Sequence, residues 1–213
     1  MTVELVFFAM FLMVIIGVPL GVVAARHSGR WPDHLVRVFY LSGWATPTFL
    51  AGFLLIIFVA PVLNIPTVPV DSHNITIVNL FLPALALAFV SLGIATRMTR
   101  TSMLEVLPMD YVKTARMKGL PENRVIYRHA LRNSLITTTT VLGITAGTLL
   151  GGTVVVESIF SIPGIGLYSY NSITHWNFAG VIACAVVFAI GVVIANLCAD
   201  VIYGLLDPRV EWR

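Results

Sequence analysis

The side chains best suited to chemistry gather in one basic stretch, DYVKTARMKGLPENRVIYRHALRN, which covers residues 110–133. Such cationic groups hold a partner by charge and hydrogen bonding. The apolar segments around it carry no His-Glu-x-x-His, Gly-x-Ser-x-Gly or paired Asp motif, and the five histidines are scattered over loops and segment ends. The sequence therefore predicts a binding surface, with no catalytic residue and no metal site.

The sequence also shows no site that could supply energy to the protein. The sequence has no Gly-x-x-x-x-Gly-Lys-Ser/Thr loop to cradle the phosphates of ATP. Its apolar segments hold no ionisable residue away from their ends, whereas proton- or sodium-driven transporters usually carry such groups near the membrane centre. We expect a partner to supply the energy, and we expect no cofactor on this chain.

The elements that position the basic stretch are membrane helices. Hydrophobic residues make up 58% of the 213 residues and charged residues 11%, and the mean hydropathy is +0.92, which is far too apolar for a soluble domain. About 20 apolar residues span a bilayer. Five segments qualify, and the second is long enough to be tilted or broken at Pro47: Leu5–Ala25, Leu35–Leu63, Leu80–Thr99, Leu135–Val156 and Gly180–Tyr203.

The positions of the 13 Lys and Arg residues predict the orientation. All of them flank the hairpin after the first segment, the loop after the third segment, or the chain end, and Lys and Arg are retained in the cytoplasm. The opposite side carries only acidic residues, namely Glu4, Asp71 and Glu157. We therefore expect an extracytoplasmic N-terminus and a cytoplasmic C-terminus.

Local signals predict a helix, a corner and a second helix within the basic stretch. Asp110 suits the N-cap of a helix over 111–118, and Gly119 suits the left-handed position that ends it. Pro121 suits the first turn of the next helix, and Glu122 is favourable at its positive end. That second helix is expected to run on into the fourth apolar segment.

The predicted corner favours a docking site. Ala115 and Gly119 are four residues apart, so they share a helix face that another protein could approach closely. The simpler interpretation is that the basic residues only set the orientation, and charge alone favours it. It does not account for an ordered helix–glycine–helix unit.

The same residues resemble a known family. Lys113-Thr114-Ala115-x-x-x-Gly119, followed by Arg128-His129-Ala130-Leu131-Arg132-Asn133, is similar to the "EAA" loop of ABC importer permeases in its dipeptide, oligopeptide and nickel branch. The stretches ESIFSIPGIG (157–166), IGVPLGVVAA (16–25) and LLDPRVEW (205–212) add to the resemblance and favour the B-type permease over its C-type companion.

The resemblance implies an all-α permease domain over residues 1–213, with a coupling loop at about 108–134 that seats in a cytoplasmic ATPase. Implied partners are a C-type permease, two ATPases that carry the ATP and Mg, an extracytoplasmic substrate-binding protein and the lipid bilayer, with no nucleic acid. In the peptide branch Lys113 and Thr114 replace the Glu-Ala of the general motif. The docking residues carried over are Asp110, Tyr111, Thr114, Ala115, Arg116, Lys118, Gly119, Leu120, Arg128, His129 and Asn133.

Two further regions are candidates. Gly143, Gly147 and Gly151 repeat every four residues, a spacing that lets helices approach closely, either within the chain or at the seam between two permeases. The resemblance places an outer gate and the surface for the binding protein in the region after the fourth segment. The gate residues expected there are Glu157, Phe160, Pro163, Gly164 and Gly166.

The chain also departs from the resembled pattern. B-type permeases begin with one more membrane helix and a large extracytoplasmic region, and we expect neither in this sequence. Two hypotheses therefore remain. The first is a permease subunit that imports peptides or related solutes by alternating access in a bacterial or archaeal inner membrane, and the second is a truncated or non-transporting scaffold that only binds partners.

Overall fold

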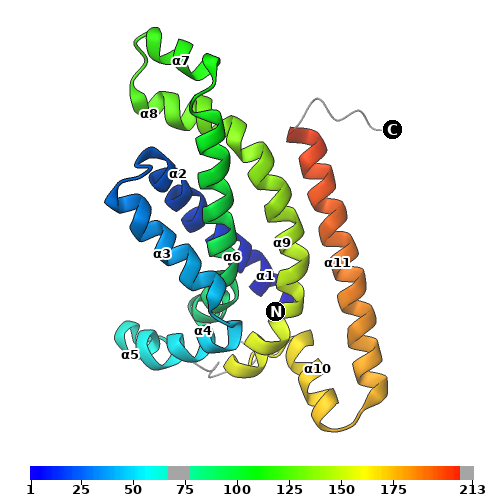
Figure 1. The fold of residues 1–213 in the computed structure, drawn as a ribbon. Helices are drawn as coiled ribbons and strands as arrows, with labels where there is room; N and C mark the ends of the chain where they lie inside the picture. Colours follow the sequence, from blue (N-terminus) through cyan, green and yellow to red (C-terminus); the bar gives the residue numbers. More distant parts are fainter. Residues whose placement is uncertain (67–76, 207–213) are drawn as a thin grey trace.

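The computed structural model describes residues 1–66 and 77–206, and every regular element in these ranges is a helix (Figure 1). The predicted all-α class is therefore confirmed. Asp71, Arg209, Arg213 and most of the stretch 205–212 entered the sequence argument but lie outside the described residues.

Four helical stretches are long and apolar enough to cross a membrane, and they match four of the five predicted segments. The first is continuous through α1 (Thr2–Leu12), η1 (Met13–Gly17) and α2 (Val18–Arg26). The others belong to α6 (Ile77–Val106), α9 (Leu131–Phe160) and α11 (Phe178–Leu206).

The remaining predicted segment, Leu35–Leu63, is broken. Helix α3 (Trp31–Ala45) ends before Pro47, and the next stretch consists of α4 (Thr48–Leu54), η2 (Leu55–Val59) and α5 (Ala60–Leu63). The two parts are bent by 111°. Thr46 is extended because the ring of a following proline disfavours the helical conformation, and Pro47 has no N–H for the helical ladder.

Helix α6 is the central element of the bundle. It packs against α1, α2, α3, α4 and α9, whereas α11 packs mainly on α9 and on the short α10 (Ile165–Thr174), at the edge of the bundle (Figure 1). The main apolar core lies among α1, α6 and α9. Large apolar side chains of α11 remain exposed, as expected for a helix whose outer side meets lipid.

A second core lies at the end of the bundle that carries most of the Lys and Arg residues, which we call the basic end. There α7 (Asp110–Met117), α8 (Glu122–Arg124) and η3 (Val125–Ala130) project beyond the membrane helices (Figure 1). Their buried faces pack on α2 and α6 through nine residues: Val22, Ala25, Met103, Val106, Val112, Ala115, Val125, Ile126 and Ala130. The projecting unit is thus seated on the bundle by an apolar socket.

Candidate functional site

The projecting unit has the predicted helix–corner–helix form, with one correction at its start. Asp110 is the first residue of α7, and the N-cap is Met109, which makes no side-chain capping bond. The predicted capping role of Asp110 is therefore wrong. Its carboxylate instead accepts a hydrogen bond from Lys113 Nζ at 2.9 Å, and this partner lowers the pKa of Asp110 below its usual value.

The corner after α7 depends on Gly119. Its φ is +73°, in the left-handed region, and its N–H donates to the Arg116 carbonyl at 2.9 Å, so the prediction for this glycine is confirmed. Pro121 is the N-cap of α8 rather than part of its first turn. Arg116 Nη2 lies 2.8 Å from Glu122 Oε1 across the corner, which lowers the pKa of Glu122 and raises that of Arg116.

The faces of α7 differ from the prediction. Ala115 is only 6% exposed and packs within the second core, so it does not form a shallow docking face with Gly119. Val112 is fully buried beside it. The outward face belongs to Met117, which is 79% exposed, with the half-exposed Tyr111 at its margin. The i, i+4 spacing identified the helix but could not say which of its faces turns inward.

The other predicted docking residues hold the unit in place or surround it. Asn133 Nδ2 donates to the Tyr111 hydroxyl at 3.0 Å, which ties the start of α9 to α7. Thr114 donates to its own helix backbone, at the Asp110 carbonyl. The residues Lys118 and Arg128 are exposed, whereas Leu120 and His129 are half-buried.

A contact that sequence reasoning missed joins α3 to α6 near the basic end. The Asp33 side chain is fully buried and accepts hydrogen bonds from Arg100 Nε at 2.6 Å and Nη2 at 2.9 Å. Arg37 Nη2 and the Gly29 N–H each add a bond at 2.9 Å. The only local signal in the sequence is the i, i+4 pair Asp33 and Arg37, since Arg100 is 67 positions away.

The three predicted packing glycines have different surroundings. A Cβ on Gly147 would lie 3.4 Å from atoms of Val192 and Asn196, so this glycine faces α11 within the chain. Gly151 is exposed, and nothing lies within 4 Å of a Cβ placed there. Gly143 is half-buried and lines an apolar groove between α1, α9 and α11. The regular spacing therefore does not correspond to one uniform contact inside the chain.

The predicted gate residues meet at the opposite end of the bundle. Helix α9 ends at Phe160, Ser161 reverses the chain with φ +53°, and α10 folds back beside α9. Glu157 is fully buried, and its Oε2 accepts the N–H of Leu167 at 3.0 Å. The structure thus brings the carboxylate and the turn together, in what we call the Glu157 clamp (Glu157, Gly164–Leu167).

The glycines of this turn are needed for space. A Cβ on Gly164 would overlap the Glu157 carboxylate, and one on Gly166 would lie 2.7 Å from Val154 Cα. Phe160 is buried in the main core, whereas Pro163 is exposed. Of the five predicted residues, three therefore form the clamp and two flank it.

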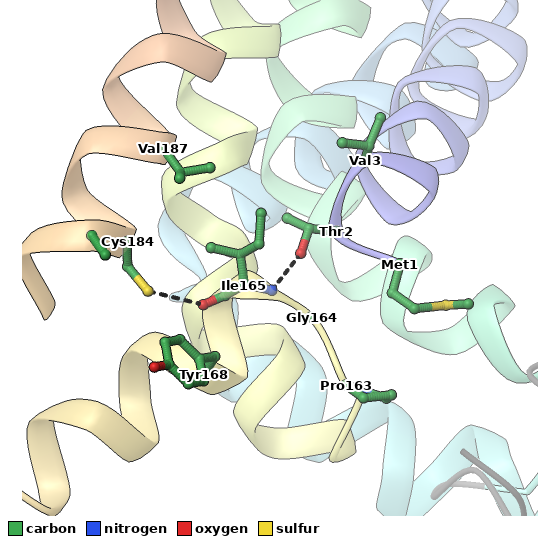
Figure 2. A pocket seen from close by; sticks show the side chains of 10 residues that line it. Met1, Thr2, Val3, Pro163, Gly164, Ile165, Tyr168, Cys184 and Val187 are labelled. Atoms are coloured by element: carbon green, nitrogen blue, oxygen red, sulfur yellow. Dashed lines mark hydrogen bonds between the residues drawn. The ribbon is translucent and has the colours of Figure 1, made fainter. Parts of the chain in front are cut away.

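A pocket of about 440 Å³ lies beside the clamp, between the start of α1 and the α10–α11 region (Figure 2). The Ile165 N–H donates to the Thr2 hydroxyl at 2.8 Å, which ties the turn to the first helix. The buried Cys184 thiol points at the Ile165 carbonyl from α11. Three helices therefore converge on one short backbone segment. In the described part of the chain, no three His, Cys, Asp or Glu side chains gather as metal ligands.

Comparisons with known proteins agree with this architecture. Residues 17–212 match the family model described as "Binding-protein-dependent transport system inner membrane component". The dipeptide transport permease DppB of Haemophilus influenzae is 36% identical, over 99% of this chain and 70% of that protein. The oligopeptide transport permease AppB of Bacillus subtilis is 38% identical, over 94% of this chain and 66% of that protein.

A structural neighbour supports the same fold. An inward-facing structure of the MetNI methionine ABC transporter has a chain that superposes with a TM-score of 0.79 at 18% identity, covering 97% of this chain and 93% of its own. Together with the all-helical membrane fold, the family match confirms the resemblance read from the sequence and favours a permease over the scaffold hypothesis. The chain belongs to the binding-protein-dependent transport system inner membrane components, and it is a multi-pass permease subunit of an ABC importer.

Proposed function

We propose that this chain imports peptides, as one half of a translocation path whose movement is driven by partner ATPases seated against α7. The observation that carries the proposal is the two-faced character of α7, with Val112 and Ala115 locked into the bundle and Met117 standing free. A helix held in this way transmits a displacement to α6 and α9, because both are directly connected to the unit formed by α7, α8 and η3. The named relatives are permeases for dipeptides and oligopeptides, which supports a peptide cargo.

The proposed assembly contains a second, C-type permease, two ATPases that bind ATP and Mg, and an extracytoplasmic binding protein. Its orientation follows from charge, since the basic end carries α7 and belongs in the cytoplasm. The Glu157 clamp then lies on the outer side, where the binding protein delivers cargo. The Gly151 surface, open in this chain, suits the seam with the second permease.

Substitution of Met117 by Glu tests the docking proposal. This side chain is almost free of the chain's own packing, so the variant should fold and reach the membrane normally. A carboxylate forced into an apolar contact costs several kcal/mol, so the ATPases should no longer co-purify and peptide-stimulated ATP hydrolysis should fall with them.

The matched control is Tyr127→Glu, since Tyr127 is also exposed but lies on η3 rather than α7. It should retain the ATPases. Normal ATPase binding and coupled uptake in Met117→Glu would overturn the proposal. Ala115→Glu is unsuitable, because it would disrupt the loop's own core.

A further inference from the structure

A hollow of about 260 Å³ on the α3–α6 face has no assigned role. Tyr40, Leu41 and Trp44 line it from α3, and Arg97 and Met98 line it from α6. The central carbon of the Arg97 guanidinium lies 5.7 Å from the centroid of the Trp44 ring. One side of the hollow is backbone, because a Cβ on Gly93 would approach the Tyr40 carbonyl oxygen to 2.7 Å. A cation, an aromatic face and apolar walls therefore surround one space.

The guanidinium lies deeper than the position of Arg97 in the sequence indicates. Side chains on a helix lean toward its N-terminus, which for α6 is away from the basic end. Trp44 is the last residue but one of α3, about 20 Å along the axis from the start of that helix. An arginine that only marks orientation would extend the other way, toward the headgroups. Arg97 instead turns its guanidinium toward Trp44.

This charge has no acidic partner in the described part of the chain. Arg100, one turn away, is only 13% exposed and shares Asp33 with Arg37, but no carboxylate lies within 4 Å of Arg97. A cation inside a membrane is costly unless it meets an anion or lines a watery path, so such residues generally mark a substrate route. The Trp44 ring contacts one face of the Arg97 guanidinium, and the N–H groups of the guanidinium remain available to another ligand.

We propose that this hollow is a carboxylate subsite on the translocation path, in which Arg97 holds the terminal carboxylate of a passing peptide. The planar fork of a guanidinium matches a carboxylate with two parallel hydrogen bonds. Trp44 and Leu41 offer apolar contact to the residue that precedes the carboxylate. Lipid phosphates belong to the headgroup layer, whereas the backbone of Trp44 lies about 20 Å along α3 from its basic end. The inference rests on the proposed peptide import.

The test uses the complete importer in proteoliposomes, with Cys184 and Cys198 of this chain changed to Ala and Leu41 changed to Cys. Anionic and cationic methanethiosulfonates of similar size report the local charge. The anionic reagent should modify Cys at position 41 about tenfold faster than the cationic one, and Arg97→Gln should abolish that preference. Arg30→Gln removes an exposed charge at the basic end and should leave the preference intact.

Added cargo distinguishes the sources of the anion. Dialanine or tetraalanine, delivered by the binding protein, should slow modification by the anionic reagent severalfold. Arg97→Gln should remove this protection and reduce peptide uptake about tenfold. Arg97→Lys should retain part of the uptake. Two results would overturn the proposal in favour of a lipid phosphate or an acid of the second permease. In the first, neither reagent modifies Cys at position 41, and in the second, added peptide does not change the rate of modification.

The experiment separates a failure of the proposed peptide import from a failure of the carboxylate subsite. If the unsubstituted importer takes up neither peptide, the proposed peptide import itself fails. If it takes up peptide while the reagents show no charge preference and Arg97→Gln transports normally, only the carboxylate subsite is refuted.

Discussion

In the described part of the chain, each end of the helical bundle buries one carboxylate, and the two are bonded by different means. At the basic end, the Asp33 carboxylate is held mainly by two arginine side chains, Arg37 and Arg100. At the opposite end, the Glu157 carboxylate accepts a backbone N–H of Leu167 at the start of α10. Side chains can exchange partners as helices move, whereas a carboxylate bonded to backbone fixes the course of the chain.

The glycines at the two ends also differ in the reason why glycine is required. Gly119 is required by its dihedral angle, and nothing lies within 4 Å of a Cβ placed on it. Gly164 and Gly166 have no such dihedral requirement but have no room for a side chain. The basic end is therefore an exposed unit free to meet another protein, and the clamp end is packed backbone against backbone.

Asp33→Asn should have the largest effect. It leaves Arg100 buried without its charge partner, and breaking a buried ion pair costs about 3–5 kcal/mol of unfolding free energy. The midpoint of thermal unfolding of the purified permease should fall clearly. Arg37→Gln is the control and should cost less than about 1 kcal/mol, since Arg37 is 39% exposed. Equal losses in the two variants would show that Asp33 and Arg100 do not form the main link between α3 and α6.

Gly166→Ala should follow. The added Cβ would lie 2.7 Å from Val154 Cα, and backbone cannot move aside as a flexible side chain does, so we expect a loss of about 3 kcal/mol. Gly151→Ala is the control, on the helix α9 that also carries Val154, because nothing lies within 4 Å of a Cβ placed on Gly151. The same thermal unfolding measurement should separate the two. A normal midpoint in Gly166→Ala would mean that the turn is not packed against α9.

Glu157→Gln should cost somewhat less, about 2 kcal/mol, because the side chain keeps its size but replaces the carboxyl group that accepts the Leu167 N–H. Its effect should be confined to the clamp. Hydrogen exchange should rise at residues 164–167 and remain unchanged in α7. Exchange that rises equally at both ends would contradict the independence of the two regions.

Gly119→Ala should have the smallest effect, about 1 kcal/mol, because alanine is strained in the left-handed region although no atom obstructs it. Gly119→Asn should cost less, since asparagine tolerates that region better. Limited proteolysis at the corner would compare the two. A larger loss for Asn than for Ala would show that space, not the dihedral angle, sets the requirement at Gly119.

The sequence predicted what depends on local spacing and composition. Four of the spans, the corner at Gly119 and the unit formed by α7 and α8 follow from apolar runs, proline and glycine. Asp33–Arg100 and Glu157–Leu167 were not predictable as contacts, because they join separate elements whose packing one sequence does not reveal. The prediction of an exposed face at Ala115 was wrong for a related reason, since periodicity defines a helix face but not its neighbour, and for the same reason the contact of Arg97 with Trp44 was not predicted.

We propose that the exposed face of α7 meets an ATPase at the cytoplasmic end. Photo-crosslinking from p-benzoylphenylalanine at position 117 tests it most directly, in the assembled importer, with position 127 as the comparison on η3. We expect residue 117 to capture an ATPase subunit and residue 127 to do so weakly or not at all. Capture from 127 with none from 117, or no ATPase captured from either position in an importer that hydrolyses ATP, would contradict it.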